Sequence, residues 1–396
     1  MNVAFLPDGP KVLSLYEGFF AGGARILHTA VVRALDATTG QQHQVFSLTN
    51  RVQREFTAQA IRDDTSYRRL RAAGIPIQAL DRDGTKALSS LDLYLLERAV
   101  RRSDVIFSLK EQPLAALAKV GTFGRPLITA LHRSDPEHSG AALESLVQLH
   151  EQGLLSAGVC CAESTQRAYH RATGIPLEKL PVIPNGVDLH KFRPNAETRR
   201  SMRAQLEVGD DSAVVLIAAR FDEMKNIGLF VAAAGEFVRR YPDAHLVMCG
   251  AGMTDENQAL TDLLDVELRH WSGREMQVHA MGIQPSMAPF YNAADLVALT
   301  SKFGEAAPLC LLEGMASGAV PVTTAVGDAA VMVGDPRLVA ELDPVAMAET
   351  WAAAYEQREE HSERILRHRQ RLSEHKGFDT YAQLINSIAA PAVLSA

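Results

Sequence analysis

Two glutamates, Glu305 and Glu313, bracket a small-residue loop and the start of an apolar helix in the segment SKFGEAAPLCLLEGMASGAVPV, residues 301–322. A carboxylate just inside a helix can accept two hydrogen bonds from a ribose diol. The small residues between the two acids would leave backbone N–H groups open to a phosphate or a sugar ring. Spacing alone establishes nothing, because 47 acidic residues among 396 produce many acid pairs by chance.

A pair of cations stands in a second segment, AARFDEMKN, residues 218–226. Arg220 and Lys225 occupy the loop between an apolar strand and a helix for which Asn226 suits the N-cap position. Two cations beside a helix N-terminus suit a diphosphate. Solvated surface charges are the plainer alternative.

The N-terminal half offers two weaker signals. Gly22 and Gly23 immediately precede the first helical pattern, where glycines let backbone N–H groups approach an anion. His132 follows the strand-like run PLITAL, residues 126–131, so it would lie at the carboxyl end of a strand. There it could donate a hydrogen bond to a sugar hydroxyl or carry a proton.

Short apolar runs alternate with amphipathic stretches along nearly the whole chain, which predicts parallel strands covered by helices on both faces. The runs begin at Val3, Gln44, Ile75, Asp104, Pro126, Ala157 and Leu180, and again at Ala213, Ala244, Met276, Asp295 and Ala319. The polar stretch between the two series predicts a linker.

The expected organisation is therefore two doubly wound, Rossmann-like α/β domains that face a central cleft. We expect an N-terminal, acceptor-side domain at 1–192, a linker at 193–212, a nucleotide-binding domain at 213–375, and a final helix at 376–396 that crosses back to the first domain. Ligands of open α/β sheets bind at the carboxyl ends of the strands, so the loops there should carry the chemistry.

Composition narrows the functional classes. The chain is 47% hydrophobic and 22% charged, with a formal charge of −7, as in an ordinary soluble protein. The negative charge argues against a nucleic-acid partner, and no apolar run reaches the ~20 residues of a membrane span. Because the N-terminus lacks a secretory pattern, we expect a cytoplasmic protein without stable membrane association.

No metal or dinucleotide motif is convincing. The four cysteines form no CxxC pair, and HExxH is absent. Asp81 and Asp83 form a DxD pattern, but three-residue acid patterns are common and nothing nearby supports a metal. Gly250 and Gly252 resemble a fragment of GxGxxG, but they follow the second strand of their domain and lack the third glycine. An NAD-dependent oxidoreductase is therefore not favoured.

Taken in order, these residues resemble the retaining glycosyltransferases of family 4, which have the GT-B fold. The resemblance spans nearly the whole chain and is carried by Gly22–Gly23, His132, IPNGVD (183–188), the R…KN pattern of 220–226, the two glutamates spaced eight apart, and LLEGMASGAVPV (311–322). Two departures stand out: residues 8–21 resemble a long insertion before Gly22, and Ala219 replaces a usual glycine.

The resemblance implies a nucleotide-sugar donor, with a UDP-sugar favoured, and neither a cofactor nor a metal. It implies His132, Glu305, Arg220 and Lys225 as the catalytic residues. The donor-binding set is Gly22, Gly23, Arg220, Lys225, Asn226, Met281, Gly282, Ile283, Ala306, Ala307, Pro308, Leu309 and Glu313. It further implies a front-face reaction, in which the leaving phosphate accepts the proton of the acceptor.

The acceptor has to be inferred from charge. Glu17, Asp135 and Glu137 are expected to face it, which favours a small, hydroxyl-rich and even cationic molecule. An aminocyclitol or another natural-product core, as in antibiotic biosynthesis, would fit. Two alternatives stay open: a nucleotide-sugar epimerase or hydrolase of the same fold, and a non-catalytic sugar-nucleotide binding protein. The oligomeric state is not determined by the sequence.

Overall fold

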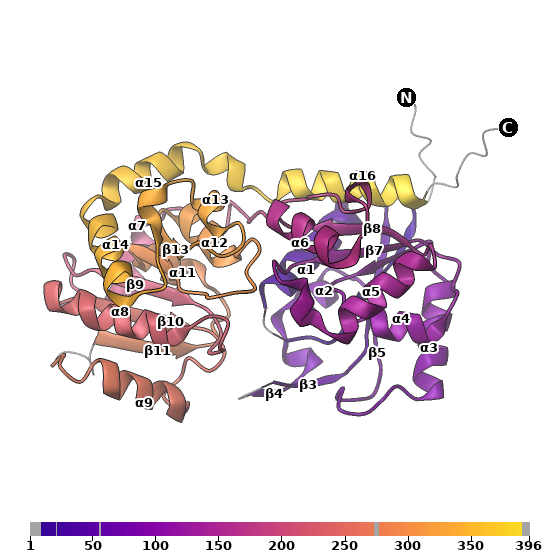
Figure 1. Ribbon diagram of the computed structural model, residues 1–396, viewed down its shortest axis with the longest axis horizontal. Helices are drawn as coiled ribbons and strands as arrows, with labels where there is room; N and C mark the ends of the chain where they lie inside the picture. Colours follow the sequence, from indigo (N-terminus) through magenta and orange to yellow (C-terminus); the bar gives the residue numbers. More distant parts are fainter. Residues whose placement is uncertain (1–8, 21, 55–56, 273–276, 390–396) are drawn as a thin grey trace. The chain divides into compact units, whose positions relative to one another are not determined.

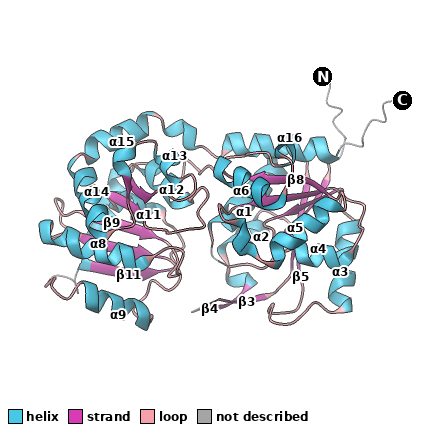
Figure 2. Cartoon of the chain, in the orientation of Figure 1, coloured by secondary structure: helices cyan, strands magenta, loops and turns pink. Residues whose placement is uncertain are grey.

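The contacts of the chain divide it into two units in the computed structural model (Figure 1). Unit 1 consists of Met1–Pro184 together with His375–Ala396, and unit 2 of Asn185–Glu374. The structure describes residues 9–20, 22–54, 57–272 and 277–389. Each unit has its own six-stranded parallel sheet, and Figure 2 shows its strands lying among helices.

The sheet of unit 1 has the order β5-β2-β1-β6-β7-β8. Its strands are β1 (Lys11–Tyr16), β2 (Gln42–Ser47), β5 (Ile77–Ala79), β6 (Val105–Ser108), β7 (Leu127–Leu131) and β8 (Leu155–Cys160). A separate antiparallel hairpin, β3 (Arg51–Arg54) and β4 (Thr57–Ala60), follows β2 and leads into the 3-10 turn η1 (Ile61–Asp63).

Helices cover both faces of this sheet, because successive side chains of a strand point to opposite faces. They are α1 (Gly23–Thr38), α2 (Thr65–Ala72), α3 (Ser90–Arg101), α4 (Leu114–Val120), α5 (Ala141–Glu151), α6 (Glu163–Thr173) and α16 (His375–Ala389), with the short turns η2 (Pro136–Ser139) and η3 (Leu177–Lys179). Val12 and Phe107 pack with α1 and α16, whereas Leu13 and Leu15 pack with α3 to α5.

The first strand differs from the expected one. The stretch KVLSLY, which lies inside the supposed insertion, forms β1 and pairs with β2 and β6. The expected strand at Val3 lies outside the described residues. The breakers Pro7, Gly9 and Pro10 made residues 8–21 resemble a loop, but Val12–Tyr16 are fully buried. Only Glu17 to Gly22 therefore separate the strand from α1.

The sheet of unit 2 has the order β11-β10-β9-β12-β13-β14. Its strands are β9 (Val214–Ala218), β10 (His245–Cys249), β11 (Val278–Gly282), β12 (Leu296–Leu299), β13 (Val320–Thr324) and β14 (Val339–Ala340). All residues of β10, β12 and β13 are buried, as expected for parallel strands covered on both faces.

The helices of unit 2 form one continuous core with this sheet. They are α7 (Ala196–Gln205), α8 (Ile227–Arg240), α9 (Gln258–Glu267), α11 (Ala288–Ala293), α12 (Leu309–Ser317), α13 (Ala329–Val333), α14 (Pro344–Glu356) and α15 (Arg358–Arg367), with the turns η4 (Pro336–Leu338) and η5 (Arg369–Leu372). Trp351 of α14 packs on Phe230 and Phe237 of α8, with ring centroids 5.4 and 5.9 Å away.

The expected linker, residues 193–212, contains α7 and is part of unit 2. Arg199 Nη2 and Arg203 Nη1 approach the two carboxylate oxygens of Asp295 at 2.6 and 3.5 Å. Arg203 is buried, and the same carboxylate accepts the backbone N–H of Val214 at 2.8 Å. Sequence alone showed only a polar stretch, because the buried partner of these arginines lies about a hundred residues away.

The C-terminal helix α16 packs on unit 1. Phe378, Tyr381 and Ile385 of α16 join the core face that contains Phe107, and Gln41 Nε2 donates to Asn386 Oδ1 at 2.9 Å. The sequence-based prediction of two parallel-sheet, Rossmann-like α/β domains is confirmed. Among the described residues, no helix is long and apolar enough to cross a membrane.

Candidate active site

Both sheets have the 3-2-1-4-5-6 order of a doubly wound fold, whose ligand site lies where the strand order reverses. In unit 2 this reversal falls between β9 and β12, which pair directly. The loop after β9 contains Arg220 and Lys225, and the loop after β12 contains Glu305. The topology therefore brings the two candidate segments to neighbouring strand ends.

The side chains of Lys225 and Glu305 meet between these loops. Lys225 Nζ forms an ion pair with Glu305 Oε1, and Ser301 Oγ donates to the same oxygen at 2.7 Å. Only 15% of the lysine and 8% of the glutamate side chain are exposed. Burial acts to lower the pKa of Lys225, but the charge of Glu305, the hydrogen bond to it and the nearby Cys310 and Asp222 together raise this pKa above its usual value. Lys225 is therefore a cation at neutral pH.

Arg220 lies in the same loop and is held by Asp222. Arg220 Nη2 approaches Asp222 Oδ2 at 2.7 Å, while the backbone N–H of Lys225 donates to Asp222 Oδ1 at 3.0 Å. One third of the arginine side chain is exposed. Asp222 thus orders the loop and leaves part of the guanidinium accessible.

Asn226 begins α8 in an unusual way. It has the left-handed φ of 51°, and the expected capping hydrogen bond from its side chain is absent. Such a conformation is strained for a residue with a side chain and is often found at functional sites. The N-terminus of α8 is thus available to an anion, with Lys225 directly before it.

The loop after Glu305 is positioned by two other segments. Asn185 Nδ2 donates to the carbonyl of Ala307 at 2.8 Å, and the backbone N–H of Asp328 donates to Ala306 O at 2.9 Å. Pro308 then begins α12 without a side-chain cap, so this second helix N-terminus also lacks an internal anion. Ala306 and Pro308 are buried, whereas Ala307 and Leu309 are partly exposed.

Glu313 lies one turn into α12 and is half-buried. The buried Tyr291 hydroxyl bonds to it, and burial followed by the nearby Glu313 charge raises the pKa of Tyr291 well above its usual value. Cys310, between the two glutamates in the chain, has a pKa raised to about 12 by burial, so its thiol is neutral. The bond from Tyr291 does not by itself exclude one from an external hydroxyl to Glu313, because a carboxylate can accept several hydrogen bonds.

The segment expected to hold a base ends β11. Gly282 has a φ of 63°, and its N–H donates to Met253 O at 2.7 Å. Met281 is partly buried, but 46% of Ile283 is exposed. An exposed isoleucine beside an ordered turn is a suitable platform for a flat ring. The neighbouring Gly250, which follows β10, has no room for a side chain, since a Cβ there would lie 1.9 Å from Ala219 O.

In unit 1 the reversal of strand order lies between β1 and β6. Gly22 precedes α1 in extended conformation, and a Cβ built there would meet nothing within 4 Å. Gly23 is the first residue of the helix. The protein's own packing therefore does not require a glycine at position 22, which leaves room for a ligand near the helix N-terminus.

His132 follows β7 and is half-buried. Desolvation, followed by the charge of Lys110, lowers the pKa of His132 to about 3. It is therefore a neutral imidazole at physiological pH, and can donate or accept a hydrogen bond. Its buried Nε2 has no partner within the part of the chain that the structure describes.

The three acids expected at the acceptor differ in their surroundings. Asp135 is buried and already paired, with Arg133 Nη2 at 2.9 Å and His138 Nδ1 at 3.3 Å. Glu137 is exposed in η2, and Glu17 is half-buried directly after β1. The charge of Asp135 is thus largely neutralised, which weakens the argument for a cationic acceptor.

Sequence reasoning missed several residues of these loops. Glu111, after β6, is buried and accepts from Ser139 Oγ at 2.8 Å and from Tyr169 hydroxyl at 3.1 Å. Asp222 and Ser301 were also missed, although both lie within five residues of a predicted site residue. The sequence signal for these residues was their position after a strand. Their role could not be predicted, because it depends on contacts that only the fold creates.

The discounted acid pair makes local contacts. Asp81 Oδ1 accepts from Asn50 Nδ2 at 2.5 Å, and Asp83 Oδ1 accepts from the backbone N–H and hydroxyl of Thr85. Within the described ranges, no group of three or more His, Cys, Asp or Glu side chains could hold a metal ion.

Two family models match the chain. Residues 21–191 match "Glycosyltransferase Family 4", and residues 212–357 match "Glycosyl transferases group 1". The D-inositol 3-phosphate glycosyltransferase of Paenarthrobacter aurescens is 33% identical over 169 residues, which are 41% of this chain and 39% of that protein. That of Xylanimonas cellulosilytica is 30% identical over 243 residues, 59% of this chain and 56% of that protein. The matched part therefore spans between two fifths and just over half of these relatives.

Solved structures resemble the whole chain. Anabaena HepE, in complex with UDP and glucose, has a TM-score of 0.79 at 20% identity and covers 96% of this chain and all of its own. A glycosyltransferase of Rickettsia africae has a TM-score of 0.78 at 14% identity and covers 97% of this chain and all of its own. At these identities the likeness shows the GT-B fold.

Proposed function

Because the chain belongs to the glycosyltransferases of group 1 and family 4, we propose that it transfers a hexose from a nucleotide-sugar donor to a small hydroxyl-bearing acceptor. The observation that supports this most directly is the meeting of Lys225 and Glu305 at the strand-order reversal of unit 2. Diphosphates and sugars bind at such points in doubly wound sheets.

The donor diphosphate would bind to the cations and helix N-termini of unit 2. Lys225 and Arg220 supply positive charge, and α8 and α12 begin without side-chain caps. Glu313 would bind the ribose and Glu305 the hydroxyls of the transferred sugar. We propose that no metal is required, since two cations and two helix N-termini can balance a diphosphate.

In the proposed reaction the sugar keeps its anomeric configuration. The bond between the anomeric carbon and the diphosphate oxygen breaks while the acceptor oxygen forms a bond from the same face. The acceptor's proton passes to the departing phosphate. Arg220 and Lys225 stabilise the charge that develops on the diphosphate, and the neutral His132 contributes a hydrogen bond rather than a strong base.

A UDP-sugar is the donor that we favour. The exposed Ile283 and the turn at Gly282 offer a surface for a pyrimidine ring. HepE, which shares the fold, was solved with UDP-glucose. The acceptor that we favour is a small polyol such as a cyclitol, because the curated relatives act on D-inositol 3-phosphate by name. An amino group on this acceptor is less favoured, since Asp135 is already paired with Arg133.

The experiment is a donor and acceptor panel. The protein is incubated with UDP-, dTDP- and GDP-sugars, each with a neutral, an amine-bearing and a phosphorylated cyclitol, and products are followed by mass spectrometry and NMR. We expect UDP-dependent transfer with an unchanged anomeric configuration. An inverted product would contradict the mechanism, and no consumption of any donor would contradict the function.

Two alternatives give different products in the same panel. An epimerase or hydrolase would change the donor at the same rate with and without acceptor. A binding protein would bind UDP without turnover. Lys225 lies in one loop with Asp222, which orders that loop, and it pairs with Glu305. We favour catalysis because a protein that only binds the sugar nucleotide would not require this cation beside Glu305.

A further inference from the structure

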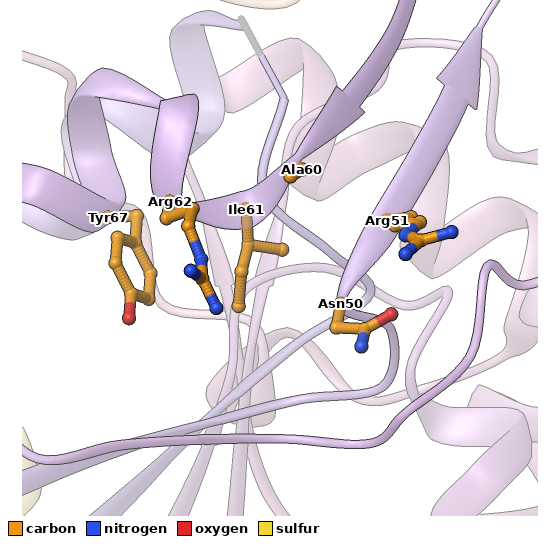
Figure 3. A pocket seen from close by; sticks show the side chains of 6 residues that line it. All are labelled: Asn50, Arg51, Ala60, Ile61, Arg62 and Tyr67. Carbon is orange, nitrogen blue, oxygen red and sulfur yellow. The ribbon is translucent and has the colours of Figure 1, made fainter.

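A cavity of about 380 Å³ lies in unit 1, outside all of the predicted sites. It is lined by Asn50, Arg51, Ala60, Ile61, Arg62 and Tyr67 (Figure 3). Its volume falls within the range of small-molecule sites, roughly 300–1,000 Å³. We call it the arginine pocket.

The lining of the arginine pocket comes from a hairpin and a helix. Arg51 begins β3, Ala60 ends β4, Arg62 lies in η1, and Tyr67 lies in α2. In Figure 3 the side chain of Arg62 extends beside the ring of Tyr67, and Arg51 stands beyond Asn50 at the other end. The pocket thus has a cation at each end.

Neither arginine is neutralised by the residues that are described. Both side chains are exposed, and no ion pair involves Arg51 or Arg62 among the residues with described side chains. No acid lines the pocket, so its lining carries two positive charges in a protein whose formal charge is −7. Arginine pairs match phosphate oxygens well, because each guanidinium can donate two parallel hydrogen bonds.

The frame around the pocket is held by internal bonds. The backbone N–H of Ile61 donates to Asn50 O at 3.1 Å, and Asn50 N–H donates to Arg82 O at 2.9 Å. The Asp64 carboxylate caps α2 by accepting from Ser66 and Tyr67 N–H at 2.8 and 3.1 Å. Asp64 is therefore committed to the helix, and Asp81, which is also nearby, accepts from Asn50 Nδ2 at 2.5 Å.

Tyr67 is fixed as well. Its ring meets Phe19 edge to face, with centroids 5.5 Å apart. Tyr67 lines the cavity, and its hydroxyl can donate a hydrogen bond to an oxygen. A phenol and two guanidiniums are a suitable set of donors for an oxyanion.

The pocket also lies where a substrate of unit 1 would be expected. Asn50 follows β2 by three residues, and β2 lies next to β1 in the sheet. The carboxyl end of β2 therefore lies at the same edge of the sheet as Gly22 and His132. This is the ligand-binding edge of a doubly wound domain.

We propose that the arginine pocket binds the phosphomonoester of a phosphorylated acceptor. The inference rests on the proposed function, which it deepens by naming the charged group of the acceptor. The hydroxyl that receives the sugar would lie on the same small polyol, and Arg51, Arg62 and Tyr67 would hold its phosphate. The role of the pocket is specificity for the acceptor and not catalysis of the transfer.

The first test measures binding alone. The full chain is saturated with UDP, so that the diphosphate loop is occupied, and glycerol 3-phosphate or glycerol is titrated in. We expect binding of the phosphomonoester only, with Kd raised about tenfold or more in Arg51→Gln or Arg62→Gln. Arg98→Gln removes an exposed arginine from α3 and should leave Kd unchanged.

Equal Kd values in the wild type and both pocket variants would overturn the proposal. Loss of phosphomonoester binding in Lys225→Gln, with Arg62→Gln unaffected, would also overturn it, because the phosphate would then occupy the diphosphate loop. This test involves no turnover, so its outcome is independent of the proposed function. The proposed function is contradicted by a different result, namely that no donor is consumed.

The second test uses turnover and the source of the phosphate. With matched phosphorylated and neutral polyols, Arg62→Gln should raise KM for the phosphorylated acceptor about tenfold and leave KM for the donor unchanged. An equal effect on both polyols would contradict the proposal. Sedimentation with phosphatidic-acid vesicles distinguishes a lipid phosphomonoester from a free one. Vesicle binding that Arg62→Gln abolishes would support a lipid source of the phosphate. Turnover of the soluble phosphorylated acceptor would support a free source.

Discussion

Lys225 of the β9 loop and Glu305 of the β12 loop form one buried ion pair across the strand-order reversal of unit 2. The pair joins two residues that the sequence separates by eighty positions. It also means that the cation proposed for the diphosphate is already committed to a carboxylate. A bound donor would therefore have to share Lys225 with Glu305.

The first prediction separates stability from ligand binding at this pair. Lys225→Met should lower the free energy of unfolding of unit 2 by roughly 3–5 kcal/mol, because it leaves the charge of Glu305 buried without its cation. Lys225→Met/Glu305→Gln should recover most of this loss. Both variants should bind UDP at least about tenfold more weakly, since the cation is missing in each.

Denaturant unfolding followed by tryptophan fluorescence measures the first effect, because both tryptophans, Trp271 and Trp351, lie in unit 2. A double variant that is no more stable than Lys225→Met would show that the pair does not set the stability of the loop. Wild-type affinity for UDP in both variants would remove Lys225 from the diphosphate site.

The second prediction assigns the two glutamates. Glu313→Gln should weaken UDP binding about 10- to 100-fold, because a charge-assisted hydrogen bond to the ribose is worth roughly 1.5–3 kcal/mol. Glutamine can still accept from Tyr291, so the packing of α12 is retained. Glu305→Gln is the comparison: it should spare UDP binding and lower turnover. Calorimetric titration with UDP decides, and equal affinity in the wild type and Glu313→Gln would exclude the ribose contact.

The third prediction concerns Gly327, which lies against the loop that carries Glu305. It has a φ of 61°, and a Cβ there would lie 2.1 Å from Glu305 O. Gly327→Ala should therefore displace Glu305 and abolish most turnover. Gly334→Ala has nearly the same backbone cost, with a φ of 67°, but its Cβ would be 3.7 Å from the nearest atom. Similar kcat values in the two variants would contradict a role for this close approach.

The fourth prediction is a pH dependence. Burial, followed by His279, lowers the pKa of His245 to about 4, from an ordinary value near 6.5. Between these values the unfolded chain binds the proton and the folded chain does not, so stability falls as pH falls from 6.5 to 4. The loss from this group is about 1.4 kcal/mol per pH unit.

His245→Gln should reduce that slope in tryptophan-detected unfolding of unit 2. His190→Gln changes an exposed histidine of the same unit and should leave the slope unchanged. Identical slopes in wild type and His245→Gln would place the acid sensitivity elsewhere.

The fifth prediction is metal independence. Transfer should survive excess EDTA, because in the proposed site Arg220, Lys225 and two helix N-termini would supply the positive charge. Asp83→Asn should also leave activity unchanged, since Asp83 bonds to Thr85 in an exposed loop. Strict dependence on added manganese would restore the DxD interpretation of Asp81 and Asp83.

The sequence predicts the architecture because apolar runs mark buried parallel strands wherever they are uninterrupted, as in β12 and β13. It failed at β1, where prolines and a glycine before Val12 resembled a loop, and at α7, whose charged residues concealed a helix tied to Asp295. Residues such as Lys225 could be proposed from the sequence because they follow a strand. Asp222 and the arginine pocket were not, since their roles depend on which loops the fold brings together.

The placement of α16 has a consequence for how the protein is made. The core of unit 1 includes Phe378 and Ile385, although the rest of this unit precedes Asn185. A ribosome therefore synthesises all of unit 2 before it synthesises α16, the helix that packs on Phe107. The domain that is synthesised first is completed last, and during that interval it exposes an apolar face to the cell.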